Sequence, residues 1–152
     1  MRLRKAEANE LDVIYSMGVD TWSGGLSLQA YLTSCRNSEK YAAGIWYVLV
    51  DKDQVVSSLI VYSRMFDLRE GCFGLGSVAT PLELRRKGYA SKLVNRIKAE
   101  LFSKHACKAL YLYSDIDQEF YRKLGFVSIQ DSDCMIYSKD QALFDGSLPA
   151  YF

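Results

Sequence analysis

A cluster of cations and small residues stands near the middle of the chain, in the stretch RRKGYAS at residues 85–91. Three cations lead through Gly88 and Ala90 into a long amphipathic pattern. At the first turn of a helix the backbone N–H groups have no intrahelical acceptor, and the positive end of the helix dipole attracts anions. Glycine lets a ligand approach the main chain and adopts φ angles closed to other residues. The stretch favours a phosphate-binding loop, and a solvated cationic turn is the alternative.

A second glycine-bearing stretch, GLGSVA at residues 74–79, matches the dinucleotide fingerprint GxGxxG/A. That fingerprint must open a helix, whereas these residues have a strand pattern that runs into Pro81. About twenty residues further on, where an acidic ribose ligand is expected, stand Asn95 and Arg96. The GxxxxGK[ST] phosphate loop is also missing. These patterns argue against a dinucleotide-binding protein and against nucleotide hydrolysis.

The elements around the loop follow from the hydrophobic periodicity. Residues 72–80 predict a strand before the loop. A long helix is expected after it, with an apolar face of Ala90, Leu93, Val94, Ile97 and Leu101, and with Lys92, Asn95, Arg96 and Lys98 turned outward. Further downstream, we expect a strand at 107–114, a short helix at 117–125 ended by Gly125, and a hairpin formed by 126–130 and 134–139.

Upstream of the loop, MRLRKA predicts a strand, and residues 7–17 and 24–37 predict two helices. Residues 44–62 predict two strands about a polar turn at 51–53. The whole order favours a mixed α/β (α+β) fold with a largely antiparallel sheet, locally parallel where the long helix connects two strands.

Composition limits the class of protein. With 152 residues the chain fits one domain, and its 19 Lys and Arg against 18 Asp and Glu argue against generic nucleic-acid binding. No apolar run approaches the roughly 20 residues of a membrane span, so we expect a cytoplasmic protein without a membrane partner. The cysteines Cys35, Cys72, Cys107 and Cys134 show no CxxC spacing, which predicts buried free thiols and no metal site.

The motif Arg85-x-x-Gly88-x-Ala90 resembles the Q/R-x-x-G-x-G/A signature of the GNAT superfamily of N-acetyltransferases. The stretch VATPLELRRKGYASKLV at 78–94 resembles the family's strand, loop and helix, and LYLYSDIDQEFYRKLGF at 110–126 resembles its next strand and helix. The resemblance implies a single GNAT-like acetyltransferase domain over residues 1–152. It also implies a sheet flanked by helices and splayed between the fourth and fifth strands.

This resemblance implies a binding site for acetyl-CoA as co-substrate, with no metal. The main chain of Arg86 to Ser91 would hold the pyrophosphate, and the strand at Ser77 to Thr80 would pair with the pantetheine arm. The chain has Ser114 and Asp115 where the family commonly has an Asn, so one contact near the pantetheine has no assigned residue. The implied cofactor-binding residues are Ser77, Val78, Ala79, Thr80, Arg85, Arg86, Lys87, Gly88, Tyr89, Ala90 and Ser91.

The implied chemistry is acyl transfer, in which a neutral amine attacks a thioester, charge builds on the carbonyl oxygen and a thiolate leaves. The backbone N–H of Val78 is the candidate donor to the oxyanion, and Tyr121 occupies the family's acid position. An amine with a pKa of about 10.4 is mostly protonated at pH 7 and needs a base or a water relay. No base can be assigned: the candidates, each also interpreted as a solvated loop charge, are Asp67, Glu70, Asp115 and the poorer Glu83.

The remaining notable residues are expected to be structural. His105, the single histidine, stands at an expected helix end, where it meets the C-terminal dipole favourably. The aromatic residues Trp22, Tyr31, Trp46, Tyr47 and Tyr62 are expected in the core or in hairpin pairs, although the first two lie in a segment that resembles the family's substrate wall. The tail at 140–152 is apolar enough to pack on its own domain or on a neighbour.

The expected function is transfer of an acetyl group from acetyl-CoA to a primary amine, by direct attack in a ternary complex. A non-catalytic acyl-CoA sensor of the same fold and an acyltransferase for longer chains are the alternatives. The acceptor, a small-molecule or peptide amine, is not identified, and neither is the choice between monomer and homodimer. By the resemblance, the last hairpin with Asp131 and Asp133 would flank the acceptor site, and together with Asp67 and Glu70 it would suit a cationic acceptor; a solvated hairpin tip is the alternative.

Overall fold

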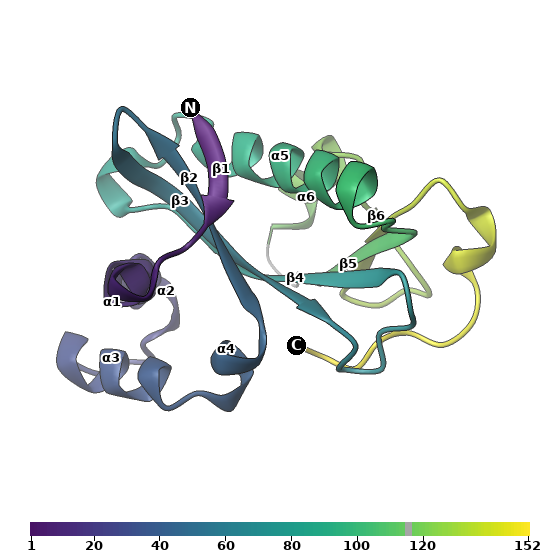
Figure 1. The fold of residues 1–152 in the computed structure, drawn as a ribbon. Helices are drawn as coiled ribbons and strands as arrows, with labels where there is room; N and C mark the ends of the chain where they lie inside the picture. The colour runs from purple at the N-terminus through teal and green to yellow at the C-terminus, as the bar shows by residue number, and fades with distance from the viewer. Residues whose placement is uncertain (115–116) are drawn as a thin grey trace. The chain divides into compact units, whose positions relative to one another are not determined.

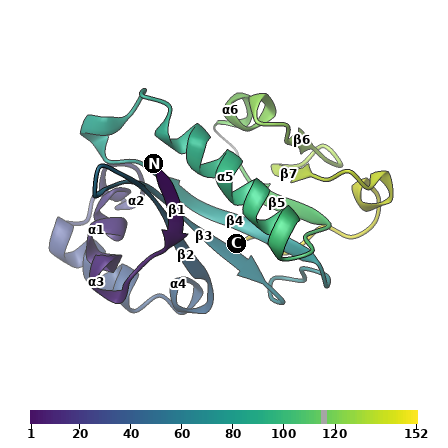
Figure 2. The ribbon, with the colours of Figure 1, turned by 45° about the horizontal axis from the view of Figure 1, so that its top comes forward.

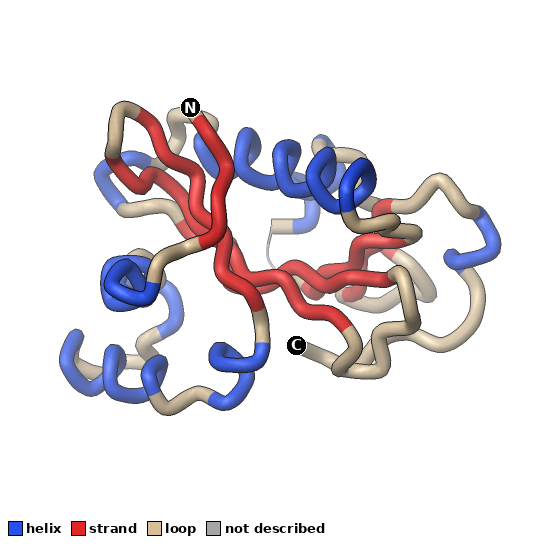
Figure 3. Tube along the Cα trace, viewed as in Figure 1, coloured by secondary structure: helices blue, strands red, loops and turns tan. Residues whose placement is uncertain are grey.

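The computed structural model describes residues 1–114 and 117–152, so the base candidate Asp115 lies outside the described residues. In the described part of the chain, seven strands form one sheet in the order β1-β2-β3-β4-β5-β7-β6. The pairs β1–β2, β5–β7 and β6–β7 are antiparallel, whereas β4 and β5 are parallel. The predicted mixed α/β fold with a largely antiparallel sheet is confirmed. Figure 3 shows its helices and strands along the chain.

The element order agrees with the order predicted from the periodicity, with short helices added. The strands are β1 (Arg2–Lys5), β2 (Ile45–Asp51), β3 (Gln54–Ser63), β4 (Cys72–Ala79), β5 (Ala109–Tyr113), β6 (Val127–Ser128) and β7 (Cys134–Tyr137). The α-helices are α1 (Leu11–Ser16), α2 (Val19–Trp22), α3 (Leu28–Arg36), α4 (Glu39–Ala43), α5 (Tyr89–Lys104) and α6 (Gln118–Lys123). Single turns of 3₁₀ helix are η1 (Ala8–Glu10), η2 (Leu82–Leu84) and η3 (Gln141–Phe144).

The chain divides into two compact units, residues 1–60 with 77–93, and residues 61–76 with 94–152. In the first unit, α1 to α4 gather beside the strands β1 to β3 (Figures 1 and 2). The short α2 and α4 were not predicted because four or five residues hold too little periodicity to detect. Ser27 and Ser38 accept backbone hydrogen bonds at the starts of α3 and α4 and so cap both helices.

The hairpin β2–β3 of the first unit is built from a buried apolar run. Val48 and Leu49 of β2 are fully buried, as are Leu59 and Ile60 of β3. At the tip, Lys52 and Asp53 have φ values of 50° and 63°. Two left-handed central residues form a turn whose twist matches that of the paired strands. The predicted hairpin is therefore confirmed, with the turn at residues 52–53.

In the second unit the parallel register joins Cys72, Phe73 and Gly74 of β4 to Ala109, Leu110 and Tyr111 of β5. The registered pairs stop at Gly74, whereas β4 itself continues to Ala79. A Cβ atom added at Gly74 would lie 2.6 Å from the ring of Phe152, so packing explains this glycine. The stretch GLGSVA is thus part of a strand and opens no helix, which agrees with the argument against dinucleotide binding.

The tail, whose packing the sequence left open, folds back on the second unit. The ring of Phe152 lies 5.6 Å from that of Tyr62 and 5.5 Å from that of Tyr113. The Ala150 N–H donates to the Phe66 carbonyl oxygen at 2.6 Å, and the Tyr113 hydroxyl donates to the Pro149 carbonyl oxygen. The tail therefore extends the apolar core of its own unit.

Helix α5 confirms the predicted apolar face but corrects one outward residue. Leu93, Val94, Ile97 and Leu101 are buried. Lys98, however, is half-buried, and its Nζ donates to the Leu124 carbonyl oxygen at 2.5 Å and lies 4.0 Å from the centre of the Tyr137 ring. Its aliphatic stem covers apolar surface while the ammonium group satisfies a carbonyl and an aromatic face. The cysteines are buried and free, as predicted.

Candidate functional site

The loop between β4 and α5 has the backbone shape of an anion site. Arg86 and Gly88 have φ values of 65° and 84°, and such left-handed residues turn successive N–H groups to one side. The first hydrogen bond of α5 joins the Lys92 N–H to the Gly88 carbonyl oxygen at 3.1 Å. The N–H groups of residues 89–91 precede this bond and have no acceptor within the helix. This main chain can therefore receive an anion.

The space above Gly88 is open. A Cβ atom added there would meet no atom within 4 Å, and the Arg86 and Lys87 side chains beside it are exposed. No protein atom would crowd a Cβ atom at residue 88, so packing does not explain the glycine. The left-handed φ of this residue, which glycine adopts without strain, does explain it. The prediction that Gly88 adopts a φ angle closed to most other residues is confirmed by its φ of 84°, whereas the approach of a phosphate to this position stays a prediction.

Arg85 anchors the base of the loop. Its Nε–H donates to the Thr80 carbonyl oxygen at 2.9 Å, and its terminal N–H groups donate to both carboxylate oxygens of Asp20 at 2.6 and 2.8 Å. One of them also donates to the Met17 carbonyl oxygen at 3.1 Å. The sequence analysis predicted that the Arg85 side chain lies near the phosphates. In the structure, however, its guanidinium group donates to protein acceptors. The arginine of the motif thus ties the end of β4 to α2, through Asp20, and to Met17 between α1 and α2.

Near its C-terminal end, β4 has a kink at Ser77. This residue has a φ of 46°, which is left-handed backbone inside a strand and departs from regular strand geometry. A left-handed residue turns the following peptide group away from its direction in a regular strand, and here the following N–H belongs to Val78. The Ser77 Oγ lies 3.0 Å from the Tyr41 hydroxyl. Sequence reasoning missed this kink because a serine in an apolar strand pattern gives no signal of positive φ.

Thr80, directly after β4, is buried, and its hydroxyl and carbonyl oxygen are hydrogen-bonded. The Ser57 hydroxyl donates to the Ala79 carbonyl oxygen at 2.8 Å and lies 2.9 Å from the Thr80 Oγ1. Ser57 has already used its proton, so Thr80 is the donor between the two hydroxyls. These bonds fix the exit of β4 just before the loop.

Tyr121 lies on α6, whose C-terminus is closed by a Schellman motif. The Gly125 N–H donates to the Arg122 carbonyl oxygen at 3.0 Å, and the Phe126 N–H donates to the Tyr121 carbonyl oxygen at 3.1 Å. Gly125 has a φ of 95°, which confirms the predicted left-handed end of this helix. The rings of Tyr121 and Phe126 lie 5.9 Å apart, the apolar contact that accompanies this motif.

The Tyr121 hydroxyl makes no hydrogen bond to any residue in the described part of the chain. Burial raises the pKa of this hydroxyl above its ordinary value, and the charge of Asp117 raises the pKa further. The phenol is therefore protonated at neutral pH and free to donate its proton.

The base candidates Asp67, Glu70 and Glu83 are exposed. Among the described residues none of the three takes part in an ion pair, and this exposure favours the interpretation as solvated loop charges. His105, directly after α5, is also exposed, 3.7 Å from a carboxylate oxygen of Glu100, in agreement with a structural role. Within residues 1–114 and 117–152, no three His, Cys, Asp or Glu side chains gather as metal ligands would.

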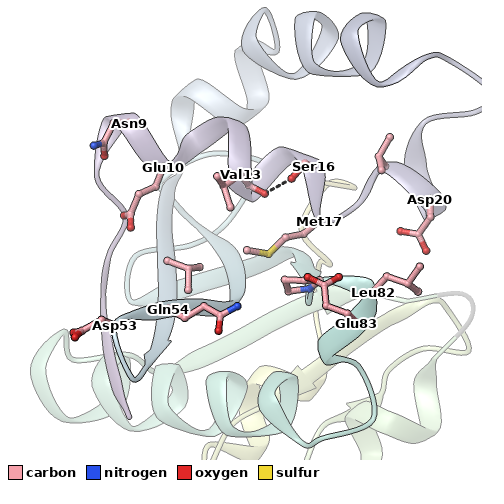
Figure 4. Close-up of a pocket in the computed structure, with 13 residues that line it drawn as sticks. Asn9, Glu10, Val13, Ser16, Met17, Asp20, Asp53, Gln54, Leu82 and Glu83 are labelled. Atoms are coloured by element: carbon pink, nitrogen blue, oxygen red, sulfur yellow. Dashed lines mark hydrogen bonds between the residues drawn. The ribbon is translucent and has the colours of Figure 1, made fainter.

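A cavity of about 580 Å³ lies in the first unit, beside the anchor of Arg85 (Figure 4). Its lining includes Met17, Leu82 and other apolar side chains, together with four carboxylates, those of Glu10, Asp20, Asp53 and Glu83. Asp20 belongs both to this lining and to the anchor, so solvent reaches the anchor from this side. None of the helices in the described ranges is long and apolar enough to cross a membrane.

Known proteins share this fold. A crystal structure of a GNAT family acetyltransferase from Brucella melitensis in complex with acetyl-CoA matches with a TM-score of 0.65 and 15% identity, over 99% of this chain and 92% of that one. A spermidine N-acetyltransferase from Vibrio cholerae matches with a TM-score of 0.67 and 15% identity, over 91% of this chain and 95% of that one. A Mycobacterium tuberculosis protein in complex with CoA matches with a TM-score of 0.59 and 18% identity, over 86% of this chain and 74% of that one.

At these identities the solved structures show a common fold alone, and no curated protein matches this chain in sequence. The family itself is shown by a family model, described as the acetyltransferase (GNAT) family, which matches residues 12–126. That range contains the kink of β4, the open loop before α5 and Tyr121. The chain therefore belongs to the GNAT family of acetyltransferases.

Proposed function

We propose that the protein is an N-acetyltransferase that transfers the acetyl group of acetyl-CoA to a primary amine, by direct attack in a ternary complex. The loop from Arg86 to Ser91 carries this proposal, because left-handed residues and the first N–H groups of α5 present an open main chain there. Exposed Arg86 and Lys87 add positive charge for the pyrophosphate. Residues 1–152 would act as one acetyltransferase domain.

The reacting thioester needs a donor for its carbonyl oxygen and an acid for its sulfur. The main chain of Ser77 to Thr80 would hold the pantetheine arm, and the Val78 N–H, redirected by the kink at Ser77, would donate to the developing oxyanion. The Tyr121 hydroxyl, protonated at neutral pH, would donate to the leaving thiolate. The amine would lose its proton to water, since no described carboxylate stands out as the base.

We further propose a cationic acceptor. In the second unit, a cavity of about 460 Å³ is lined by Tyr113, Ser114, Asp131, Ser132, Asp133 and Tyr151. The two carboxylates are exposed at the hairpin tip, and the rings of Tyr113 and Tyr151 lie 5.3 Å apart. Carboxylates and aromatic faces are the groups that attract ammonium ions. The Vibrio cholerae relative in fold, a spermidine N-acetyltransferase by its name, supports this choice of acceptor.

Release of free thiol from acetyl-CoA, measured across a panel of small amines, polyamines and lysine peptides, tests the proposal. We expect thiol release that depends on an amine, with acetylated amine as the second product. Binding of acetyl-CoA without turnover on any amine would instead indicate a non-catalytic sensor of the same fold. Faster turnover with longer acyl-CoA substrates would indicate that the protein transfers a longer acyl group in place of acetyl.

A further inference from the structure

The kink in β4 lies at a residue with a side chain, Ser77, and not at a glycine. Left-handed backbone is strained for a residue with a Cβ atom and persists only where the surroundings hold it. Gly74 and Gly76 lie in the same strand, yet neither has a positive φ, whereas Ser77 does. Ser77 is also the residue of this strand whose hydroxyl meets a partner, the Tyr41 hydroxyl at 3.0 Å. The left-handed conformation therefore occurs at the residue whose side chain has a hydrogen-bond partner.

Tyr41 is itself fixed on several sides. Its N–H donates to the Ser38 Oγ at 3.2 Å, in the cap of α4. Its ring stacks on Tyr15 with a centroid distance of 5.8 Å and meets the edge of Trp46 at 5.1 Å. The Tyr41 hydroxyl is thus a rigid support, which is what a strained neighbour needs.

We propose that Tyr41 is a positioning residue, which holds Ser77 in its left-handed conformation and so sets the direction of the Val78 N–H. Its effect on catalysis rests on the proposed function above, but its effect on the backbone does not. Loss of the Tyr41 hydroxyl leaves the chemistry of every reacting group intact and lets the peptide between Ser77 and Val78 relax toward the regular strand.

The test compares Tyr41→Phe, Ser77→Ala and the double variant with the parent protein. Each single variant is expected to lower kcat by about 10- to 100-fold, the range for a misplaced oxyanion donor. The double variant should lose no more than the worse single variant, because both remove the same hydrogen bond. The affinity for acetyl-CoA should fall by less than kcat, because the loop at 86–91 is untouched and only one peptide group of the pantetheine-binding strand moves. Tyr15→Phe is the matched control, because the Tyr15 hydroxyl makes no hydrogen bond in the described part of the chain.

NMR of the labelled protein reads the backbone at Ser77 without turnover, through its coupling constants and carbon shifts. We expect left-handed values in the parent and in Tyr15→Phe, and values moved toward extended strand in Tyr41→Phe. If the parent releases no thiol while Ser77 still responds to Tyr41→Phe, the proposed function fails and Tyr41 remains the support of the kink. Unchanged Ser77 signals, with kcat losses that are absent or simply additive, would overturn the inference.

Discussion

At the scale of single residues, Tyr121 combines a fixed position with an unused proton. The Schellman motif holds its carbonyl oxygen and the ring of Phe126 holds its own ring, while its hydroxyl donates to no described residue. Burial raises the pKa of the hydroxyl, so its acid form is present throughout the neutral and moderately alkaline range. A fixed position and a bound proton are two requirements of a general acid for a departing thiolate, although the raised pKa makes this phenol a weaker acid.

Tyr121→Phe is therefore expected to lower kcat by about 10²- to 10⁴-fold, the range for loss of a positioned acid, while acetyl-CoA affinity holds. Single-turnover rates and calorimetry measure the two quantities separately. Tyr137→Phe serves as control, because its ring also packs against Phe126 and its hydroxyl makes no hydrogen bond in the described residues. An undiminished kcat for the Tyr121 variant, with chemistry rate-limiting, would leave this tyrosine a structural aromatic.

At the scale of elements, the end of α6 depends on Gly125. A Cβ atom there would lie 3.1 Å from the ring of Tyr137, in backbone with a φ of 95°. Gly125→Ala should lower the free energy of unfolding by about 2 kcal/mol or more, from left-handed strain plus crowding. Gly146→Ala isolates the strain, because Gly146 has a φ of 101° and open space around it, so about 1 kcal/mol is expected. Equal losses in urea denaturation would show that the contact with Tyr137 is unimportant.

The link between β1 and η1 is an ion pair whose strength depends on pH. Arg4 donates to both carboxylate oxygens of Glu10 at 2.8 and 2.9 Å. This hydrogen-bonded guanidinium lowers the pKa of Glu10 to about 2. Because the pKa is lower in the folded state, the pair stabilises the fold above the unfolded pKa of about 4.3 and loses this effect as the pH falls toward 2.

Glu10→Gln should accordingly lower the free energy of unfolding by about 1 kcal/mol at pH 7, at the upper end for a bidentate pair near the surface. Urea denaturation between pH 7 and pH 2 should show the parent and variant converging as the pH falls. Glu119→Gln is the control, since its single contact with Arg122 at 3.4 Å is exposed and should contribute less than about 0.5 kcal/mol. A constant difference across the pH range would contradict the assignment to this pair.

Periodicity predicted the elements well where burial sets the pattern. The apolar face of α5 follows from Leu93 to Leu101 because a helix that covers a sheet must bury one stripe. Lys98 was wrongly predicted to face outward because its acceptor, the Leu124 carbonyl oxygen, lies 26 residues away in sequence. Local patterns hold no information on such a contact.

The candidate site shows the same division. Gly88 was predicted to need unusual φ angles, since a glycine directly before a helix usually provides a backbone conformation that residues with a Cβ atom avoid. The kink at Ser77 and the bond from Arg85 to Asp20 were not predictable, because a hydroxyl or a guanidinium reveals its partner only when the fold brings them together. The sequence motif was enough to locate the loop at 86–91, whereas the contacts of each side chain became known only from the folded structure.

At the scale of the whole molecule, charge is nearly balanced, with a net charge of +1. A long-range field that steers cations is therefore weak, and any steering must come from local groups such as Asp131 and Asp133. Replacing both by Asn should lower kcat/KM for polyamines about 10-fold at low salt and leave weakly charged amines unaffected. Asp145 is an exposed carboxylate of the same unit, and Asp145→Asn should leave kcat/KM unchanged both for polyamines and for weakly charged amines. If every amine is acetylated as before at low salt, the hairpin has no part in acceptor choice.

The central claim, that the main chain of the loop at 86–91 holds the pyrophosphate of acetyl-CoA, is tested most directly by calorimetry on Gly88→Asp. The variant places a carboxylate in the open space above the loop and should weaken acetyl-CoA binding at least 100-fold through charge repulsion and steric exclusion. Gly146→Asp makes the same change at another left-handed, uncrowded glycine and should bind like the parent. Equal acetyl-CoA affinity in the parent and in Gly88→Asp would contradict the claim.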